Sequence, residues 1–516
     1  MKKNILFTFI FFTGVLLCHA QDLVKVKETN TVPGGNGYPS NLTACNGKLF
    51  FTANDNTGYA SLWVTGGTDV TTLQLGPASP VLSSVRNLVS YKNKLYFQCD
   101  DGINGPEVWT SDGTVAGTVL FKDVYPGSNG SYPQSFTVAN NTLFFYTYDI
   151  GGIKKLFSTD GTAAGTVLLR TGITEFNGLT TFAILNNNIY FTSDDGTGSG
   201  YGLWKSDGTL GGTSFVSKNL IPGVSGGNYA VLNNKLYFSG FDYTNGSELW
   251  VTDGTNVGTH IVMNLAPDGG GVLGSGSPQN MVVYNGKIYF TGNDQVHGNE
   301  LFVSDGITIQ LVKDVLAGTD GSQPVPIVFN GLLYIIYGQL FELWKSDGTS
   351  AGTQLVKSIA PYSKFAGIWN SKLYMTNDFD YSVWQSDGTA AGTGLIKVQN
   401  TNNQIFSYGA DRTFTAFNGD FYFSGQCAGI TSGYELVKLT LGGAAVTTFT
   451  FTGSGNWSNP ANWAGGIVPP ATLPSGYSVI INGNCILDVA VVFQSGASLT
   501  VNAGKSLLIL GSLTVL

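Results

Sequence analysis

Asn233-Asn234-Lys235-Leu236-Tyr237-Phe238 is followed, after a turn, by Leu249-Trp250-Val251-Thr252-Asp253-Gly254-Thr255. Leu, Tyr and Phe favour strands, and the Asn pair before them tolerates the positive φ of a tight turn. The second segment is another strand of apolar and β-branched residues, and it ends in an Asp-Gly turn. This pair of segments recurs along the chain. The turns that open the successive copies begin at Asn46, Lys92, Asn140, Asn186, Asn233, Asn285, Asn330, Asn370 and Asn418.

This repeat predicts the fold. A period of roughly 40–50 residues built from short strands is typical of a β-propeller, in which each blade is a four-stranded sheet. The unit from Ser135 to Arg170 contains four such strands, at 136–138, 142–147, 155–158 and 165–170. We therefore predict an all-β chain with a large closed propeller of eight or nine four-stranded blades. The repeat count favours nine blades, and one degenerate unit would leave eight.

The two ends of the repeat region complement each other. Leu23-Val24-Lys25-Val26 resembles the fourth strand at 120–124, yet it precedes the first complete unit. The last unit reaches Glu435-Leu436-Val437 and has no good fourth strand of its own. A strand from the N-terminal end can therefore complete the last blade, which closes the ring without an exposed sheet edge.

The first twenty residues have the pattern of an export signal: Lys2 and Lys3, an apolar run over 6–17, and a small residue, Ala20, before the expected cleavage point. The run is too short to span a bilayer, which takes about 20 residues. No later segment is long and apolar enough to do so. We therefore expect an exported chain without a membrane-spanning segment after signal removal.

The charge of the chain restricts its partners. Without the two signal lysines, the 25 basic residues become 23 against 33 acidic ones, a net charge of −10. Nucleic acid and anionic lipid surfaces attract basic patches, so neither is expected to be a partner. Four cysteines remain after signal removal, and four thiols in so large a chain are no disulfide framework. We expect isolated thiols at Cys45, Cys99, Cys427 and Cys485.

The pattern of strands and turns changes near the C-terminal end of the sequence. Asn456-Trp457-Ser458-Asn459-Pro460-Ala461-Asn462-Trp463 precedes a Pro-rich turn, and short strands separated by Gly follow at 498–501, 506–510 and 512–516. This rhythm is typical of successive rungs of a parallel β-solenoid. We predict a signal peptide at 1–20, a propeller at 21–441 and a small C-terminal β-rich, solenoid-like module at 442–516.

The motif Glu248-Leu249-Trp250-Val251-Thr252-Asp253-Gly254-Thr255, with Gly258-Thr259 after it, resembles the ELWxxDGT repeat. The resemblance covers about 22 to 441, with departures such as Gly66-Gly67-Thr68, which lacks the Asp. It implies an exported protein, extracellular or on the outer cell surface of a Gram-negative bacterium. The segment with Trp457 and Trp463 resembles modules that open β-solenoid regions in such proteins. The family implies no particular reaction.

One recurring pattern, Asp-x-x-Asn/His-Gly-x-Glu, supplies a candidate metal site. Calcium prefers several carboxylate and carbonyl oxygens, and a tight loop with an acid at each end could provide them. The alternative is a polar hairpin without metal, and we favour that alternative. The candidate calcium ligands are Asp101 and Glu107, Asp242 and Glu248, and Asp294 and Glu300.

The aspartates of the Asp-Gly-Thr turns have a simpler interpretation. Asp before Gly-Thr can accept backbone N–H bonds and stabilise the turn, and repetition at equivalent places indicates architecture. The Trp or Phe three residues earlier is expected to pack between blades. These aspartates are Asp112, Asp160, Asp207, Asp253, Asp305, Asp347 and Asp387.

Catalytic residue types are scarce. Beyond the signal, the chain has two histidines, His260 and His297, and no G-x-S-x-G nucleophile elbow. Arg86 and Arg412 fall on equivalent first strands of their units, whereas Arg170 falls on a fourth strand, which fits a convergent anion site poorly. We predict a non-catalytic extracellular or cell-surface binding or adhesion propeller that engages a glycan or a protein. The alternatives are a carbohydrate-active enzyme, glycosidase or lyase, on the same scaffold, and a passive spacer of the cell envelope.

Overall fold

The computed structural model describes residues 21–76, 82–148, 151–173, 182–194, 200–218, 220–223, 229–266, 274–396, 414–426, 433–441, 448–464, 468–469, 472–473, 478–493 and 495–515. The chain divides into two compact units. One is Leu23–Leu439, and the other includes Thr440–Leu516. The described residues form β-strands throughout, with a single short 3-10 turn, η1, at Pro460–Asn462.

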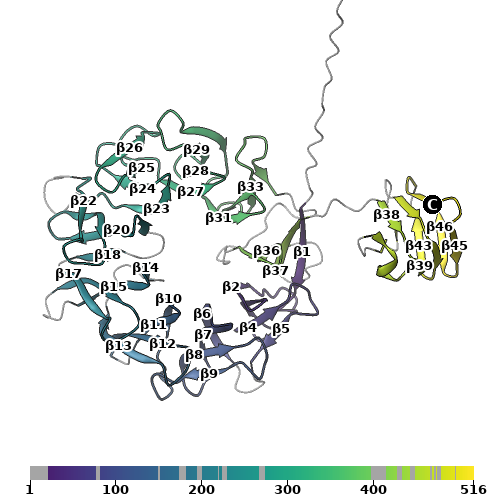
Figure 1. Cartoon of the computed structure of the whole chain (residues 1–516), viewed down its shortest axis with the longest axis horizontal. Helices are drawn as coiled ribbons and strands as arrows, with labels where there is room; N and C mark the ends of the chain where they lie inside the picture. Colours follow the sequence, from purple (N-terminus) through teal and green to yellow (C-terminus); the bar gives the residue numbers. More distant parts are fainter. Residues whose placement is uncertain are drawn as a thin grey trace, which may run out of the picture. The chain divides into compact units, whose positions relative to one another are not determined.

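The strands of the larger unit form antiparallel sheets set side by side around a central opening (Figure 1). We number them sheet 1 to sheet 9 in chain order. Sheets 1 to 3 contain β2 (Ser40–Cys45), β3 (Lys48–Asn54), β4 (Ala60–Thr65) and β5 (Leu73–Leu75); β6 (Ser83–Tyr91), β7 (Lys94–Asp100), β8 (Pro106–Ser111) and β9 (Val119–Lys122); and β10 (Gln134–Ala139), β11 (Thr142–Tyr148), β12 (Lys154–Thr159) and β13 (Val167–Ile173).

Sheets 4 to 6 follow the same plan, with one additional strand, β18, beside β20 in sheet 5. They contain β14 (Ala183–Leu185), β15 (Asn188–Asp194), β16 (Tyr201–Ser206) and β17 (Ser214–Lys218); β18 (Ile221–Gly223), β19 (Tyr229–Leu232), β20 (Lys235–Asp242), β21 (Gly246–Thr252) and β22 (His260–Met263); and β23 (Gln279–Tyr284), β24 (Lys287–Asn293), β25 (Asn299–Ser304) and β26 (Ile309–Lys313). A bridge between Ile173 and Ser193 joins sheets 3 and 4.

The last three sheets complete the unit. They contain β27 (Pro324–Phe329), β28 (Leu332–Tyr337), β29 (Glu342–Ser346) and β30 (Gln354–Ser358); β31 (Ser363–Trp369), β32 (Lys372–Asn377), β33 (Val383–Ser386) and β34 (Gly394–Leu395); and β35 (Thr415–Phe417), β36 (Asp420–Gly425), β37 (Glu435–Leu441) and β1 (Gln21–Lys27). The strand β1 lies beside β37, so the prediction that an N-terminal strand completes the last sheet is confirmed.

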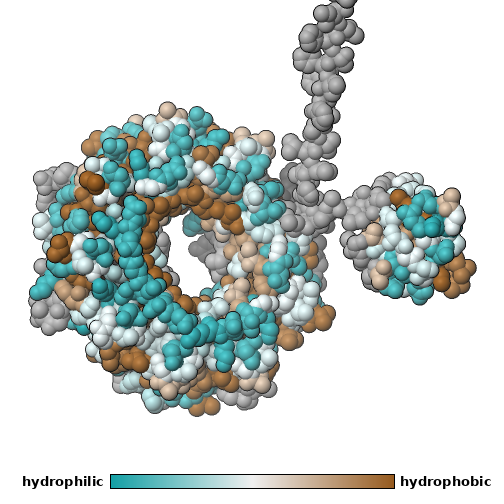
Figure 2. Space-filling view, viewed as in Figure 1, coloured by the Kyte–Doolittle hydropathy of each residue, from teal (hydrophilic) through white to brown (hydrophobic). Residues whose placement is uncertain are grey.

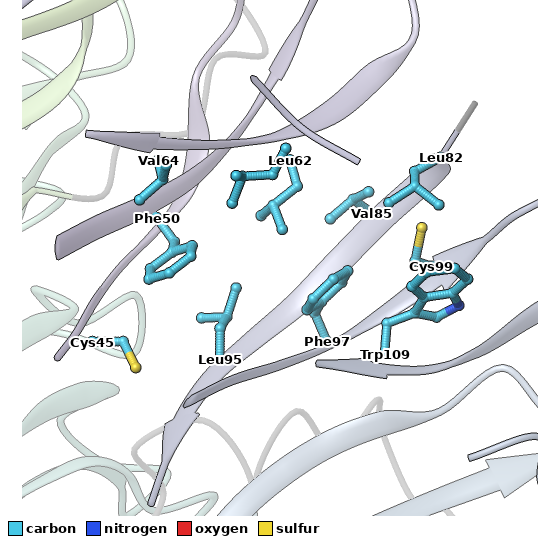
Figure 3. Close-up of a cluster of buried hydrophobic side chains, with 11 residues drawn as sticks. Cys45, Phe50, Leu62, Val64, Leu82, Val85, Leu95, Phe97, Cys99 and Trp109 are labelled. Carbon is cyan, nitrogen blue, oxygen red and sulfur yellow. The ribbon is translucent and has the colours of Figure 1, made fainter. Parts of the chain in front are cut away.

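The core lies between neighbouring sheets. Each Asn-led strand is buried on both faces, which is why its sequence is a run of apolar and aromatic residues and does not alternate. In sheet 2, for example, Leu95, Tyr96 and Phe97 are all almost fully buried. Figure 3 shows one such layer, in which Phe50 and Leu62 of sheet 1 meet Leu95 and Phe97 of sheet 2.

In most sheets the strand nearest the opening is the first strand, as for β6, β10, β23 and β31 (Figure 1). Several of these strands expose an apolar residue just before their last residue, and Figure 2 shows hydrophobic surface around the opening within a largely hydrophilic ring face. The exposed residues at that place are Val138, Val231, Val283 and Ile368.

Several neighbouring sheets are also joined by polar contacts at the Asp-Gly-Thr turn. The Tyr96 hydroxyl donates to the Gly161 carbonyl, 3.3 Å away, in the following sheet. The Lys48 ammonium donates to the carbonyls of Asp112 and Gly113 in the same way. These turns therefore serve as contacts between sheets as well as chain reversals.

The contact between sheet 9 and sheet 1 is of the same kind. The Tyr422 hydroxyl lies against Gly67, in the turn of sheet 1 that lacks the Asp. The Lys27 ammonium, on β1, pairs with the Asp69 carboxylate at 2.9 Å. A buried cluster that includes Phe51 and Leu436 joins the two sheets.

The smaller unit consists of three parallel three-stranded sheets. Their strands are β38 (Thr448–Phe451), β41 (Ser478–Ile481) and β44 (Ser498–Val501); β39 (Ser454–Asn456), β42 (Asn484–Leu487) and β45 (Ser506–Ile509); and β40 (Thr472–Leu473), β43 (Ala490–Phe493) and β46 (Ser512–Val515). The chain visits the three sheets in turn and then repeats, which is the winding of a solenoid with three rungs.

The cysteines and the membrane prediction can be compared with this fold. Cys45, Cys99 and Cys485 are buried and free, as expected, and Cys427 lies outside the described residues. Burial raises the pKa of the Cys99 thiol well above its usual range. In the described part of the chain, no helix is long and apolar enough to cross a membrane.

Candidate functional site

The aspartates of the predicted calcium loops close hairpins. Asp101 Oδ1 accepts the backbone N–H groups of Ile103 and Asn104 at 2.9 and 2.8 Å, and Oδ2 accepts the Asn104 side chain. Burial tends to raise the pKa of Asp101, but these hydrogen bonds outweigh it and hold that pKa below its usual value. Asp242 has the same role in sheet 5.

Asp294 differs only in its side-chain partner. Its Oδ1 accepts the backbone N–H groups of Val296 and His297, and its Oδ2 lies 2.7 Å from His297 Nδ1. The hydrogen bond to Asp294 raises the pKa of the His297 imidazole. One of the two histidines beyond the signal is therefore engaged in closing a hairpin.

The glutamates of the same loops bind a different segment. Glu107 is fully buried, and it accepts hydrogen bonds from Val124 N at 3.0 Å, Tyr125 N at 3.1 Å and Ser131 Oγ at 2.6 Å. These donors belong to the connector that leads from sheet 2 to sheet 3. We call this arrangement the glutamate clamp.

Three further glutamates form such clamps. Glu248 accepts from Leu265 N and Gly276 N, and Glu300 accepts from Ser322 N and Oγ. Glu435 holds the N-terminal connector through Thr29 and Gly37. Burial, the largest effect, raises the pKa of Glu107 to about 7 and also raises the pKa of the other three carboxyl groups.

In each predicted pair, the aspartate thus accepts hydrogen bonds from its own hairpin, whereas the glutamate accepts them from a connector between sheets. Within the described ranges, no group of three or more His, Cys, Asp or Glu side chains could hold a metal ion. This geometry agrees with the polar hairpin without metal, which is the alternative to a calcium site. Calcium binding at Asp101/Glu107, Asp242/Glu248 and Asp294/Glu300 stays a prediction.

The repeated turn aspartates have the expected local role. Asp112 Oδ1 accepts Thr114 N at 2.9 Å and Thr114 Oγ1 at 2.7 Å, and the Thr114 hydroxyl accepts Gly117 N in turn. The same contacts recur at Asp160, Asp207, Asp253, Asp347 and Asp387.

The arginines do not converge within the described residues. Arg170 donates to Ser193 and Asp194 of the next sheet, and its guanidinium lies 3.5 Å from the centre of the Trp204 ring. Arg86 is on β6, the first strand of sheet 2, whereas Arg170 is on β13, the fourth strand of sheet 3. Arg412 lies outside the described residues.

A pocket of about 550 Å³ lies in the larger unit, at sheets 6, 7 and 8. Sheets 7 and 8 lack the glutamate clamp, since Glu342 instead accepts the Trp344 indole N–H at 2.8 Å and Ser382 stands at the matching place in sheet 8. Residues of sheets 6, 7 and 8 line the pocket: Ser277, Gln279, Asn280, Thr291, Asn299, Gln323, Pro324, Val325, Ile336, Gly338, Gln339, Phe341, Tyr362, Ser363, Lys364 and Asp378.

The neighbouring clamps position part of this lining. Glu300 holds Ser322, and the next residue, Gln323, has a φ of 53° and donates its backbone N–H to the Asn299 carbonyl at 3.0 Å. Tyr362 precedes β31 as Gln323 precedes β27, and its φ is 59°. Gln323 and Tyr362, the last residues of their connectors, therefore line the pocket in a left-handed backbone conformation, and a strand begins directly after each of them.

The pocket contains one ion pair. Lys364 Nζ lies 2.9 Å from Asp378 Oδ2, and the lysine side chain is 69% exposed. Asp378 N also donates to the Tyr362 carbonyl at 3.4 Å. The rings of Phe341 and Tyr362 are 5.9 Å apart and tilted by 55°, so they form no flat platform.

Sequence reasoning missed this pocket. The hairpins at 338–341 and 378–382 lack the Asp-x-x-Asn-Gly-x-Glu pattern, but the corresponding hairpins of sheets 1, 3 and 4 lack it as well, so its absence does not indicate a pocket. Three sheets contribute lining residues that lie up to about a hundred positions apart, and the repeat does not indicate which residues of neighbouring sheets face one another.

No family model matches the chain, and no curated protein sequence matches it. Solved structures that resemble it include prolyl oligopeptidase B from Galerina marginata bound to a 35mer hydrolysis and macrocyclization substrate, with 12% identity and a TM-score of 0.38 over 67% of this chain and 54% of that one. Another is puromycin hydrolase, with 12% identity and a TM-score of 0.34 over 67% of this chain and 60% of that one. The chain spans little more than half of their length.

These comparisons correct the predicted function. The neighbours are peptidases and a hydrolase, and this contradicts the prediction of a non-catalytic glycan- or protein-binding adhesion propeller. At this level of similarity they assign neither a reaction nor a substrate to the chain. The resemblance to ELWxxDGT-repeat proteins stays a prediction.

Proposed function

We propose that this chain is an exported propeller with nine blades, closed by β1, and that its pocket between sheets 6, 7 and 8 is the substrate site of a peptide hydrolase. The ring closure is supported by β1 beside β37 and by the contacts of Lys27 and Tyr422 with sheet 1. Export is supported by the pattern of the first twenty residues.

The observation that carries the proposal is the number of amide side chains in the pocket. Five amide side chains line it: Gln279, Asn280, Asn299, Gln323 and Gln339. Each side-chain amide offers both a donor and an acceptor, as each peptide group does. An extended peptide can therefore exchange its hydrogen bonds with water for hydrogen bonds with the amide groups of this lining.

The remaining lining suits the side chains of such a substrate. Pro324, Val325, Ile336 and Phe341 supply an apolar part of the wall. Ligand pockets are commonly of this kind, mostly apolar with a few polar groups that fix orientation. Lys364, paired with Asp378 but largely exposed, can also donate to a carboxylate of the substrate.

The experiment compares peptide binding and cleavage in matched variants. The mature chain is incubated with a mixture of defined peptides, and retained peptides and newly formed N-termini are measured by mass spectrometry. Gln323→Ala and Lys364→Ala should each weaken peptide retention about tenfold, equivalent to about 1.4 kcal/mol. Lys94→Ala, which alters an exposed lysine of sheet 2 outside the pocket, should leave it unchanged.

Three outcomes would contradict the proposal. The first is retention of glycans and not of peptides. The second is equal retention by the Gln323→Ala, Lys364→Ala and Lys94→Ala variants. The third is the absence of new N-termini from every peptide that is retained.

A further inference from the structure

The first strands of the sheets bring an apolar residue to one level of the central opening. The residue before the last of each strand pairs with the start of the apolar run in the next strand, as Val231 pairs with Leu236. It is apolar in every sheet except sheet 2, which has Ser90 there. We call four exposed members of this level the apolar collar: Val138, Val231, Val283 and Ile368.

Two cations occupy a second level of the same strands. Arg86 pairs with Gln98 and Lys364 with Thr376, each three residues further along the second strand than the residue that faces the first level. Both cations are exposed, and they lie on β6 and β31, which are nearest the opening in their sheets (Figure 1). Three residues of a strand span about 10 Å, so the two levels are separated by that length along each strand.

This second level is cationic in an otherwise acidic chain. Beyond the signal, 33 acidic residues stand against 25 minus the two signal lysines, a net charge of −10. In the described first strands, Arg86 and Lys364 are the charged residues and none is acidic; these strands are β2, β6, β10, β14, β19, β23, β27, β31 and β35. Local charge of one sign attracts the opposite charge, so this level favours anionic groups.

The two cations have room to bind such a group. No ion pair joins Arg86 to another described residue. Lys364 pairs with Asp378, but its side chain is 69% exposed and its ammonium has three donors. A carboxylate can accept two parallel hydrogen bonds from the Arg86 guanidinium, which is the stronger kind of charge-assisted contact.

The pocket between sheets 6, 7 and 8 reaches the same level. Gln279 pairs with Thr291 and Val325 pairs with Ile336, at the place in their sheets that Lys364 has in sheet 8. Gln279, Val325 and Lys364 all line the pocket. A peptide in the pocket therefore lies at the cationic level, with the apolar collar further along the same strands.

We propose that the site selects acidic peptides: Lys364 and Arg86 bind carboxylate side chains, and the apolar collar contacts an apolar side chain of the same peptide. An extended peptide advances about 3.3 Å per residue, so the acidic and apolar residues should be about three residues apart. This inference rests on the proposed function and names the class of its substrate. The absence of acidic residues from the described first strands supports it, because a like charge there would repel the substrate.

Two matched peptides test the charge preference. One carries Glu three residues from Leu, and the other is identical except for Lys in place of Glu. Binding to the mature chain is measured by fluorescence anisotropy. A hydrogen bond to a charged group contributes enough that the Glu peptide should bind about tenfold more tightly. The preference should shrink as salt is added, because salt screens exposed charges.

Charge reversal in the protein tests the residues. Arg86→Glu should weaken binding of the Glu peptide about tenfold and strengthen binding of the Lys peptide. Lys94→Glu makes the same reversal at an exposed residue of sheet 2 outside the opening, and it should leave the preference unchanged. Val231→Ser should weaken both peptides, whereas Val257→Ser, at a 93% exposed turn position of the same sheet, should weaken neither. Thermal melting should show all four variants folded.

Cleavage is followed in the same samples through newly formed N-termini, which separates this inference from the hydrolase proposal. Preference for the Glu peptide that Arg86→Glu reverses, without new N-termini, would support acidic selection and contradict hydrolysis. Equal affinity for the two peptides, or an unchanged preference in Arg86→Glu, would overturn acidic selection even if both peptides are cleaved. Binding of neither peptide would overturn both.

Discussion

Glu435 Oε2 accepts two hydrogen bonds from Thr29, one from its backbone N–H and one from its hydroxyl, each 2.8 Å long, across 406 residues of sequence. Glu435 is fully buried, and it begins β37, the strand that β1 joins. One carboxylate therefore connects the N-terminal connector to the last sheet of the same unit.

Removing this carboxylate should destabilise the unit strongly. In Glu435→Ala, the buried N–H and hydroxyl groups of Thr29 lose their acceptor, whereas the Gly37 N–H keeps its bond to the Tyr434 carbonyl. An unsatisfied buried polar group costs about 1–3 kcal/mol. Deletion of residues 21–32 should cost more, because it also removes β1. Denaturant unfolding measures both, and Glu342→Ala, whose carboxylate accepts only from a nearby indole, should cost less than half as much. An unchanged melting temperature after the deletion would contradict closure by β1.

The glutamate clamps predict how stability varies with pH. Burial raises the folded-state pKa of Glu107 to about 7, above its ordinary value of 4.5. The folded state then favours the protonated carboxyl, so this contribution to stability is complete below pH 4.5 and is lost as the pH rises toward 7. We expect the unfolding free energy to fall across that window, and Glu107→Gln should make the fall shallower.

The aspartates of the hairpins affect stability over a different, more acidic pH range. The pKa of Asp101 is depressed below its ordinary value of 3.8, so its contribution is present above that pH and is lost in more acidic solution. Urea unfolding at closely spaced pH values separates the two effects. A slope between pH 4.5 and 7 that is the same in Glu107→Gln and in the unmodified chain would refute the glutamate prediction.

Calcium can be tested by its effect on melting. If the loops bind the ion, the melting temperature should rise with calcium, fall with chelator, and respond less in Asp294→Ala, because a ligand specific for the folded state stabilises it. The hydrogen bonds already made by Asp294 and Glu300 favour the opposite outcome, a flat melting temperature from chelator up to about 5 mM calcium. The change in melting temperature with calcium therefore distinguishes a metal site from a polar hairpin.

The turn glycines that contact the preceding sheet should be intolerant of a side chain. Gly348 has a φ of 95°, and a Cβ there would collide with the Tyr289 hydroxyl. Gly318 has a φ of 113° with open space around it, so Gly318→Ala carries only backbone strain, about 1–3 kcal/mol. Gly348→Ala should cost about 1–2 kcal/mol more than Gly318→Ala in denaturant unfolding. Equal costs would mean that the Tyr289 contact does not constrain this turn.

The sequence alone determined the strands, the turns and their repetition. Runs such as Leu95-Tyr96-Phe97 favour strands regardless of context, and Asp112 binds Thr114 two residues away, so both were predictable from local chemistry. The placement of β1 was also predictable, because its match to the fourth strand of other units is a property of the repeat.

The tertiary structure decided which donors each acid meets. Asp101 and Glu107 look like a pair in the sequence, but the antiparallel hairpin sends the glutamate toward a connector 17 to 24 residues further on. The pocket likewise depends on how sheets 6, 7 and 8 face one another. These contacts join segments that are distant in the chain. Which residues meet therefore depends on how the sheets pack, and local sequence patterns do not reveal it.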